Sequence, residues 1–365
     1  MHSYVLPDRI WLPAKAPVRW LRNDFADLME FMVIRQSWRI LIACLIICNC
    51  SFGQQPKHIS VKRNLRLMGS NFEITVVAQN EEIGYINIEE ASAEIKRIEK
   101  LISSWDPDSE TSRINQNAGI QPVAVSNELY HLIERAVQLS ELTQGAFDIT
   151  YATLDTIWKF DGSMQRSPAT AEIQQWKAIG GYRNLILNAD DHSVFLKNKG
   201  MKINFGGIGK GFAADKAKAL LVSKQVKAGM INAAGDITAW GTRATGEKWL
   251  LGVANTLGNG NLITWIPLVE SSVAISGIAR KYINVNGVHY SDVLDPRTGM
   301  PVGGVSKVTV FGKMAEFCDA LSTAIAVIGT EKGLALVNQL GDTEVIIEEV
   351  GGGRFQSNGL LLDMR

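Results

Sequence analysis

The order of strand-like and helix-like segments constrains the fold of this 365-residue chain more than any other feature. Strand-like runs dominate after residue 180, and only two predicted helices, 212–222 and 315–328, interrupt them. Strands and helices do not alternate one to one, which argues against a regular series of parallel βαβ units. We therefore predict an α+β fold, a single large domain of mixed sheets with flanking helices. The predicted strands are 72–78, 184–187, 194–196, 202–205, 229–232, 249–253, 308–311 and 344–348.

Three further helices are predicted before residue 180. Apolar residues recur at steps of three and four over 87–103, which indicates an amphipathic helix. A second helix over 126–142 starts at Ser126 and stops before a glycine. Ser167 and Pro168 together are typical of a third helix start.

Composition excludes several classes of protein. Hydrophobic residues make up 46% of the chain and charged residues 20%, so the chain is not a largely disordered one. Lys plus Arg and Asp plus Glu both number 37, which lacks the basic excess of a general nucleic-acid binder. Of the four cysteines only Cys318 lies outside the N-terminal region, so neither a disulfide framework nor a Cys/His zinc site is expected.

The N-terminal region has the pattern of an export signal. Arg35 and Arg39 precede a short uncharged apolar run, and small residues follow it before Gln54. We interpret 1–31 as a possible over-extended N-terminus, 32–53 as the signal peptide and 54–365 as the mature domain. A buried helix is a less favoured alternative, and lipoprotein cleavage at Cys44 ranks third.

The segment 202–215, KINFGGIGKGFAAD, runs from a predicted strand through four glycines into a helix. It fails the Walker pattern and the strict dinucleotide pattern, and fits only a relaxed form of the latter. A glycine-rich turn at a helix N-terminus favours phosphate. A tight turn with close packing explains the glycines equally well, so both interpretations remain open.

Asp319, Ser322 and Thr323 fall on one face of the predicted helix 315–328, opposite its apolar stripe. One carboxylate and two hydroxyls suit a hard cation such as Mg²⁺. A polar outer face is the commoner explanation of such a pattern. Asp295 and Arg297 lie in a strong turn signature, for which a structural role is again the commoner explanation.

Other catalytic patterns are missing from the sequence. There is no serine nucleophile elbow, no H-E-x-x-H and no C-x-x-C motif, and the five histidines are scattered. Mechanisms based on a Ser-His-Asp triad or on zinc are therefore poorly supported.

Seven short segments in a fixed order resemble the ApbE family, the FAD:protein FMN transferases. The resemblance runs from about Leu67 to near the C-terminus. The matching segments are MGS at 68–70, SSWDPDSETSRIN at 103–115, GAFDIT at 145–150, GGIGKGFAAD at 206–215, NAAGD at 232–236, DPRTG at 295–299 and DALSTA at 319–324.

The resemblance implies an exported, Mg²⁺-dependent enzyme that cleaves FAD, transfers FMN to a threonine of an acceptor protein and releases AMP. The acceptor is expected to be an electron-transport subunit, and the enzyme to be periplasmic or associated with the inner membrane on its periplasmic side. No nucleic-acid partner is expected. By position, the metal ligands would be Gly209 through its carbonyl, Asp319, Ser322 and Thr323. The FAD-binding residues would be Met68, Trp105, Ala146, Phe147, Asp148, Gly206, Phe212 and Val293.

Two aspartates, Asp236 and Asp292, are the candidates to accept the proton of the threonine. Asp292 stands where the family has a histidine, and Ile275 and Ala279 replace a hydroxyl and an aromatic residue. These departures leave two alternatives open: an FAD pyrophosphatase that yields FMN and AMP, or an inactive exported FAD-binding protein.

Overall fold

The computed structural model describes residues 58–161, 163–254, 262–277, 282–285 and 288–360. The predicted signal peptide and the possible over-extended N-terminus lie outside the described residues, so both stay predictions. None of the helices in the described ranges is long and apolar enough to cross a membrane.

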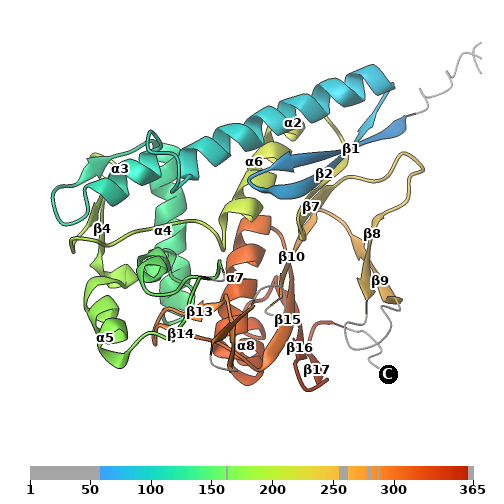
Figure 1. Cartoon of the computed structure of the whole chain (residues 1–365). Helices are drawn as coiled ribbons and strands as arrows, with labels where there is room; N and C mark the ends of the chain where they lie inside the picture. The colour runs from blue at the N-terminus through green and yellow to red at the C-terminus, as the bar shows by residue number, and fades with distance from the viewer. Residues whose placement is uncertain (1–57, 162, 255–261, 278–281, 286–287, 361–365) are drawn as a thin grey trace, which may run out of the picture. The chain divides into compact units, whose positions relative to one another are not determined.

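The described residues form a mixture of helices and mostly antiparallel sheets (Figure 1). The helices are α2 Glu81–Ile102, α3 Glu110–Gln116, α4 Asn127–Leu142, α5 Thr170–Ile179, α6 Gly209–Ser223, α7 Ala315–Ile328 and α8 Thr330–Val337, with the 3₁₀ helices η1 Ile149–Thr156 and η2 Tyr182–Asn184. The strands are β1 Ile59–Leu67, β2 Ser70–Ala78, β3 Val123–Ala124, β4 Leu185–Asn188, β5 Ser193–Leu196, β6 Gly229–Ala233, β7 Asp236–Trp240, β8 Trp249–Ala254, β9 Leu262–Leu268, β10 Ser271–Gly277, β11 Tyr282–Val285, β12 Val288–Ser291, β13 Leu294–Asp295, β14 Met300–Pro301, β15 Val305–Gly312, β16 Glu344–Glu349 and β17 Arg354–Gln356. The predicted α+β class is confirmed.

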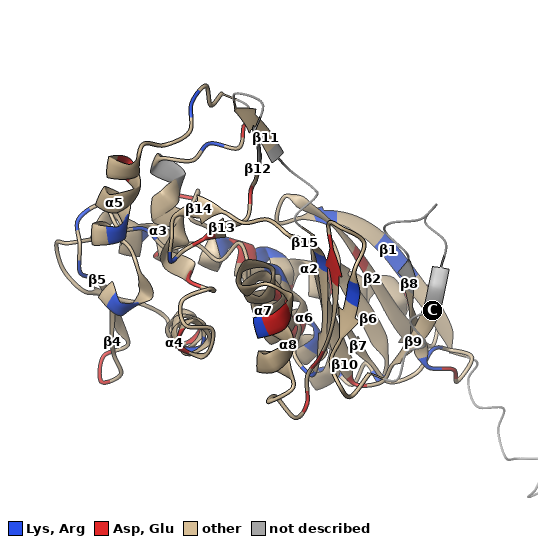
Figure 2. Cartoon of the chain, turned by 90° about the horizontal axis from the view of Figure 1, so that it is seen from below, with Lys and Arg blue, Asp and Glu red and all other residues tan. Residues whose placement is uncertain are grey.

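One eight-stranded sheet, ordered β1-β2-β6-β7-β10-β15-β16-β17, organises the domain. Helices α2, α6, α7 and α8 lie on one side of it, and the β8–β9 hairpin lies on the other (Figure 2). Trp249 and Leu268 of that hairpin pack on Ile237 and Val273 of the sheet. The sheet is therefore covered by helices on one face and partly by a hairpin on the other.

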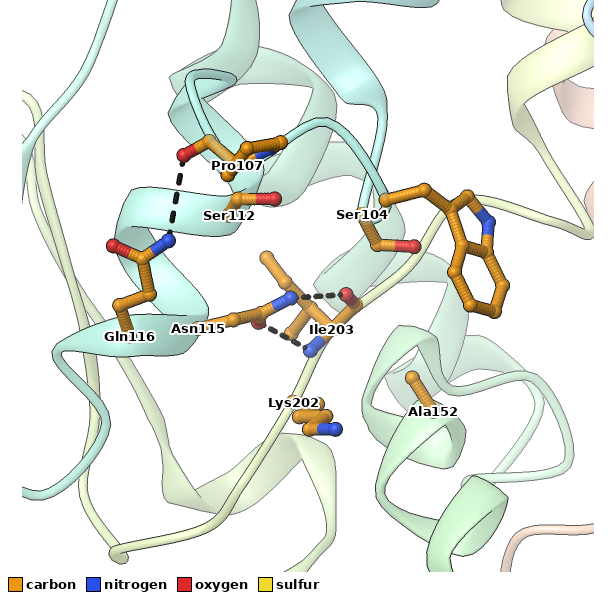
Figure 3. A pocket seen from close by; sticks show the side chains of 9 residues that line it. Ser104, Pro107, Ser112, Asn115, Gln116, Ala152, Lys202 and Ile203 are labelled. Atoms are coloured by element: carbon orange, nitrogen blue, oxygen red, sulfur yellow. Dashed lines mark hydrogen bonds between the residues drawn. The ribbon is translucent and has the colours of Figure 1, made fainter.

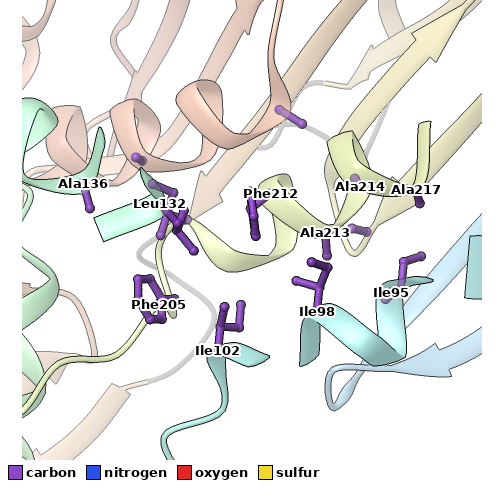
Figure 4. Close-up of a cluster of buried hydrophobic side chains, with 14 of the residues drawn as sticks. Ile95, Ile98, Ile102, Leu132, Ala136, Phe205, Phe212, Ala213, Ala214 and Ala217 are labelled. Atoms are coloured by element: carbon purple, nitrogen blue, oxygen red, sulfur yellow. The ribbon is translucent and has the colours of Figure 1, made fainter. Parts of the chain in front are cut away.

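The main core lies between α2 and α6. Ile95 and Ile98 of α2 project toward Ala217 and Ala213 of α6 (Figure 4). Ile102 packs at the start of α6, where a Cβ at Gly209 would meet it. Small side chains on α6 let the isoleucines of α2 approach closely, as ridges pack into grooves. This packing fixes where α6 begins relative to the sheet.

Most predicted elements are confirmed, but some helix starts are shifted. The helix predicted from 87 begins at Glu81, because Asn80 accepts a hydrogen bond from the backbone N–H of Ile83 and caps it. The helix predicted from 212 begins at Gly209, inside the glycine run. The helix expected to open at Ser167 and Pro168 begins at Thr170, where Glu172 accepts from the backbone N–H of Ala169.

The strand predicted over 202–205 is wrong, since these residues belong to no sheet. Side chains take the place of a neighbouring strand. Asn115 pairs with Ile203 in both directions, donating to its carbonyl and accepting from its N–H (Figure 3). Thr153 does the same for Lys202. The backbone hydrogen bonds of this extended segment are thus satisfied without a sheet.

Helix α7 lacks a capping side chain of its own, and Asp215 of α6 supplies one. A carboxylate oxygen of Asp215 accepts from the backbone N–H of Glu316 at 2.9 Å. Burial raises the pKa of Asp215 to about 6, and the nearby charge of Glu316 adds to the increase. The two helices are therefore joined at a carboxyl group whose ionisation is costly.

Substitution of Gly211 by alanine should destabilise the fold. A Cβ at this position would lie 2.3 Å from the carbonyl oxygen of Ala315, so α6 and α7 would have to separate. We expect a loss of about 2 kcal/mol in the free energy of unfolding, measured by urea denaturation. Gly351→Ala is the control, because a Cβ there meets nothing within 4 Å. Equal urea midpoints for the two variants would contradict this packing.

The Asp215 carboxyl should make stability depend on pH. Its pKa is higher in the folded protein, about 6, than the ordinary 3.8, so its stabilising contribution is complete below pH 3.8 and is lost as pH rises through 6. Asp215→Asn keeps the acceptor oxygen without the charge. The variant should therefore gain about 2 kcal/mol relative to the parent between pH 4 and pH 7. Parallel stability curves across this range would refute the assignment.

Candidate functional site

Two turns project from the same end of the large sheet. Met68 and Gly69, both with positive φ, connect β1 to β2, and Ala234 and Gly235 connect β6 to β7. Phe72 of β2 pairs with Ala233 of β6, which places the two turns side by side. The sheet therefore brings residues near 69 and near 235 to one location.

A lysine and two buried carboxylates lie behind the β6–β7 turn. The Nζ atom of Lys210 is 2.6 Å from Oδ2 of Asp236 and 3.4 Å from Oδ2 of Asp319. The backbone N–H of Gly211 also donates to Oδ2 of Asp319, at 3.3 Å. Both carboxylates are at least 95% buried at their side chains. One ammonium group thus bridges acids contributed by β7 and α7.

These charges shift each other's ionisation. Burial, the largest cause, and the neighbouring charge of Asp319 together raise the pKa of Asp236 to about 7, although Lys210 opposes both effects. Burial alone would lower the pKa of Lys210, but Asp319 and Asp236 outweigh it, and the pKa is raised. The lysine therefore stays charged inside the protein.

Three hydroxyl groups lie beside the acids. The Oγ atom of Ser276 is 2.8 Å from Oγ of Ser322 and 3.4 Å from Oγ1 of Thr323. A Cβ at Gly207 would lie 3.3 Å from Oγ1 of Thr323, so the glycine turn directly faces this part of α7. The two segments that the sequence left ambiguous, the glycine run and the polar face of α7, are thus in contact.

A cavity of about 690 Å³ opens in front of this cluster. That volume is in the range of small-molecule binding sites. Its lining combines three of the predicted FAD-binding residues, Met68, Trp105 and Gly206, with Lys210. The other lining residues are Gly69, Ser70, Glu99, Ile102, Ser103, Ser104, Tyr151, Asn204 and Phe205. Trp105 is 86% exposed, so its ring offers a face on which an aromatic ligand can stack.

The predicted residues of the GAFDIT segment are buried, and Phe147 lies beside the glycine turn. Ala146 and Phe147 are buried, and a Cβ at Gly207 would touch the ring of Phe147. Both carboxylate oxygens of Asp148 accept backbone N–H groups, from Thr150 and Tyr182. Asp148 therefore shapes the start of η1, and its role toward FAD stays a prediction.

The remaining predicted residues are spread around the site. Phe212 is buried in the core, with the cations of Arg135 and Lys216 over its ring. Val293 packs on the core cluster around α7 and α8. Asp292 is half-buried.

Of the two other departures from the family pattern, only Ile275 is described, and it lies in the large sheet on β10. Ile275 is half-buried and packs in the cluster beneath the β8–β9 hairpin. Ala279 lies outside the described residues.

The predicted metal ligands have suitable chemistry. Asp319 supplies a carboxylate and Ser322 and Thr323 supply hydroxyls, all oxygen donors that hard cations prefer. Within the described ranges, no group of three or more His, Cys, Asp or Glu side chains is arranged to hold a metal. Lys210 already neutralises Asp319. A divalent cation here would therefore share the carboxylate with an ammonium group.

Sequence reasoning missed two members of the site, Lys210 and Ser276. Lys210 lies between Gly209 and Gly211, at the first turn of α6, and a lysine placed there reaches toward whatever the helix end faces. Ser276 had no sequence signal, because its approach to Ser322 depends on how β10 packs against α7.

Known proteins resemble this chain in sequence over most of its length. The family model described as "ApbE family" matches residues 68–347. A Vibrio cholerae protein named FAD:protein FMN transferase is 26% identical over 88% of this chain and 97% of its own length. A Klebsiella pneumoniae protein of the same name is 30% identical over 69% of this chain and 78% of its own length.

Solved structures show the same fold. The ApbE protein of Thermotoga maritima superposes with a TM-score of 0.74 at 32% identity, covering 81% of this chain and 96% of its own. The apo form of the Pseudomonas stutzeri flavinyl transferase ApbE gives 0.73 at 25% identity, covering 82% of this chain and 95% of its own. The family model and these relatives together define an enzyme that transfers a phosphorus-containing group. The chain belongs to the ApbE family.

Substitution of Lys210 by methionine should destabilise the protein strongly. It would leave the carboxylates of Asp236 and Asp319 buried without a counter-charge. We expect a loss of about 3 kcal/mol or more in the free energy of unfolding, measured in EDTA. Lys313→Met is the matched control, because its ion pair with Asp342 is exposed and is worth less than about 1 kcal/mol. Similar losses in both variants would contradict the role of the buried bridge.

Proposed function

We propose that this enzyme transfers FMN from FAD to a threonine hydroxyl of an acceptor protein and releases AMP. The observation that carries the proposal is that Lys210 lines the 690 Å³ cavity and also bridges the two buried acids. A ligand in the cavity is thus in contact with fixed positive charge. Cleavage of a pyrophosphate needs such charge neutralisation more than it needs a covalent nucleophile.

The chain's own residues bind and orient the substrate. Trp105 stacks on an aromatic ring of FAD, and Met68 lies against it from the β1–β2 turn. Gly206 has no side chain, which lets the pyrophosphate approach the start of α6, where backbone N–H groups and the helix dipole favour negative charge. Lys210 stabilises the phosphate charge at the junction of the cavity and the acid cluster.

The site is proposed to work with Mg²⁺. Asp319, Ser322 and Thr323 would hold it, with the carbonyl of Gly209. When bound, the ion neutralises the phosphate oxygens and favours departure of AMP. Asp236 is the better candidate to accept the threonine proton, because it lies beside Lys210, which lines the cavity, and because its pKa is raised to about 7. Asp292 is the alternative.

The proposal includes the cellular setting. Residues 32–53 direct export, and the mature enzyme acts on the periplasmic side, free or associated with the inner membrane. The acceptor is an electron-transport subunit that carries flavin.

The mass of the chain purified from a cell-envelope extract tests the export step: cleavage after Gly53 is expected, and an intact N-terminus would argue against it.

Transfer should be lost in Asp319→Ala. A purified, unflavinylated electron-transport subunit is incubated with residues 54–365, FAD and Mg²⁺, and its intact mass is measured with and without EDTA. The parent should add one FMN in a reaction that EDTA abolishes. Asp319→Ala should transfer FMN about 100-fold or more slowly than the parent, because a group that stabilises charge at the pyrophosphate is removed.

Asp342→Ala, an exposed aspartate, is the matched control and should transfer at the parental rate. AMP production without the acceptor would favour the pyrophosphatase. Full activity of Asp319→Ala would overturn the metal assignment.

A further inference from the structure

A second cavity, of about 700 Å³, lies on the opposite side of the β1–β2 turn from the proposed FAD cavity. We call it the amide groove. It is lined by Asn64, Leu65, Arg66, Asn71, Phe72, Glu73, Asn232, Ala234 and Gly235. None of the predicted FAD or metal residues lines it.

Strand register explains why polar side chains gather there. Asn64 pairs with Glu73, Arg66 pairs with Asn71, and Glu73 in turn pairs with Asn232. Residues paired directly across a sheet project from the same face. The intervening Phe72 is buried in the core on the helical side. The groove is therefore the polar end of the sheet face that the helices leave uncovered.

The two cavities share a wall. Met68, Gly69 and Ser70 line the FAD cavity, and the next residue, Asn71, lines the amide groove. On the other side, Gly235 lines the groove, and the next residue, Asp236, contacts Lys210. A chain lying in the groove reaches the acid cluster by passing over one two-residue turn.

The lining suits a polypeptide. Asparagine side chains both donate and accept hydrogen bonds, which matches the alternating N–H and C=O groups of an extended backbone. Glu73 is already paired with Lys62 at 2.9 Å. Arg66 is exposed and forms no ion pair with any other described residue. The charge left at the rim is therefore positive and complements an acidic side chain.

We propose that the amide groove binds an extended segment of the acceptor protein, next to the threonine that receives FMN, with an acidic side chain opposite Arg66. This inference rests on the proposed function. The segment lies across β1 and β2 and delivers the threonine over the Ala234–Gly235 turn. FAD and acceptor thus enter from opposite sides of the β1–β2 turn, so each can bind while the other is present.

Blocking the groove tests the proposal. Asn64→Cys is made in residues 54–365, where the other cysteine, Cys318, is buried, and is labelled with a bulky polyethylene glycol maleimide. Ser60→Cys, labelled in the same way, is the matched control. It is exposed, on the same strand and the same face, four residues from Asn64. Transfer to the unflavinylated electron-transport subunit and FAD binding by flavin fluorescence are both measured.

The labelled Asn64→Cys protein should lose about tenfold or more in kcat/KM for the acceptor, with FAD affinity unchanged. The labelled control should retain both. Equal transfer by the two labelled proteins would overturn the proposal that the acceptor binds in the amide groove, while leaving the proposed function intact. A loss of FAD affinity in the labelled Asn64→Cys protein, alongside the loss of transfer, would also overturn this proposal, since the groove would then belong to the FAD site. Absence of transfer by the unlabelled parent would refute the proposed function and the groove with it.

The charge of Arg66 gives a second test. Arg66→Glu should raise KM for the acceptor about tenfold with kcat unchanged, and the effect should weaken at high salt because the contact is exposed. Arg66→Lys, which keeps the positive charge, should retain most of the parental affinity for the acceptor. An unchanged KM in Arg66→Glu would remove the acidic contact from the proposal.

Discussion

The ammonium group of Lys210 is the interaction on which the site depends. It lies between carboxylates from β7 and α7, so it connects the sheet to the helical layer as well as neutralising two buried charges. Charges removed from water are tolerated only when they are paired. Asp319 lies on the same helix as Ser322 and Thr323, whose hydroxyls donate to its backbone carbonyl, and Lys210 also lines the cavity. Lys210 therefore contributes both to stability and to the charge of the cavity wall.

Close packing makes this arrangement possible. Gly211 lets α6 approach the backbone of α7, and the alanines of α6 receive the isoleucines of α2. The two interpretations left open for the glycine run are therefore complementary. Gly211 serves helix packing, whereas Gly206 borders the cavity. A single glycine-rich segment both compacts the helical layer and leaves backbone accessible to a ligand.

Much of the fold could be predicted from the sequence, because periodicity and capping residues are local signals. Helix α7 was predicted with its observed bounds, and α4 was placed by Ser126. The strand predicted over 202–205 failed because Asn115 and Thr153, distant in sequence, satisfy its backbone. For the site, Asp319 and Thr323 could be selected by their spacing. The ion pair between Lys210 and Asp236 could not be predicted from the sequence, since it depends on the register of β7 against the helices.

The position of β2 in the large sheet has a consequence for folding. Phe72 pairs with Ala233, so residues separated by more than half of the domain must meet before the sheet closes. Such long-range pairings impose a high entropic cost and slow folding. The β6–β7 turn, which follows one of these long-range pairings, supplies part of the wall of the amide groove. An incomplete chain that still lacks β6 and β7 therefore has neither the Asp236 partner of Lys210 nor the wall of the amide groove that Ala234 and Gly235 supply.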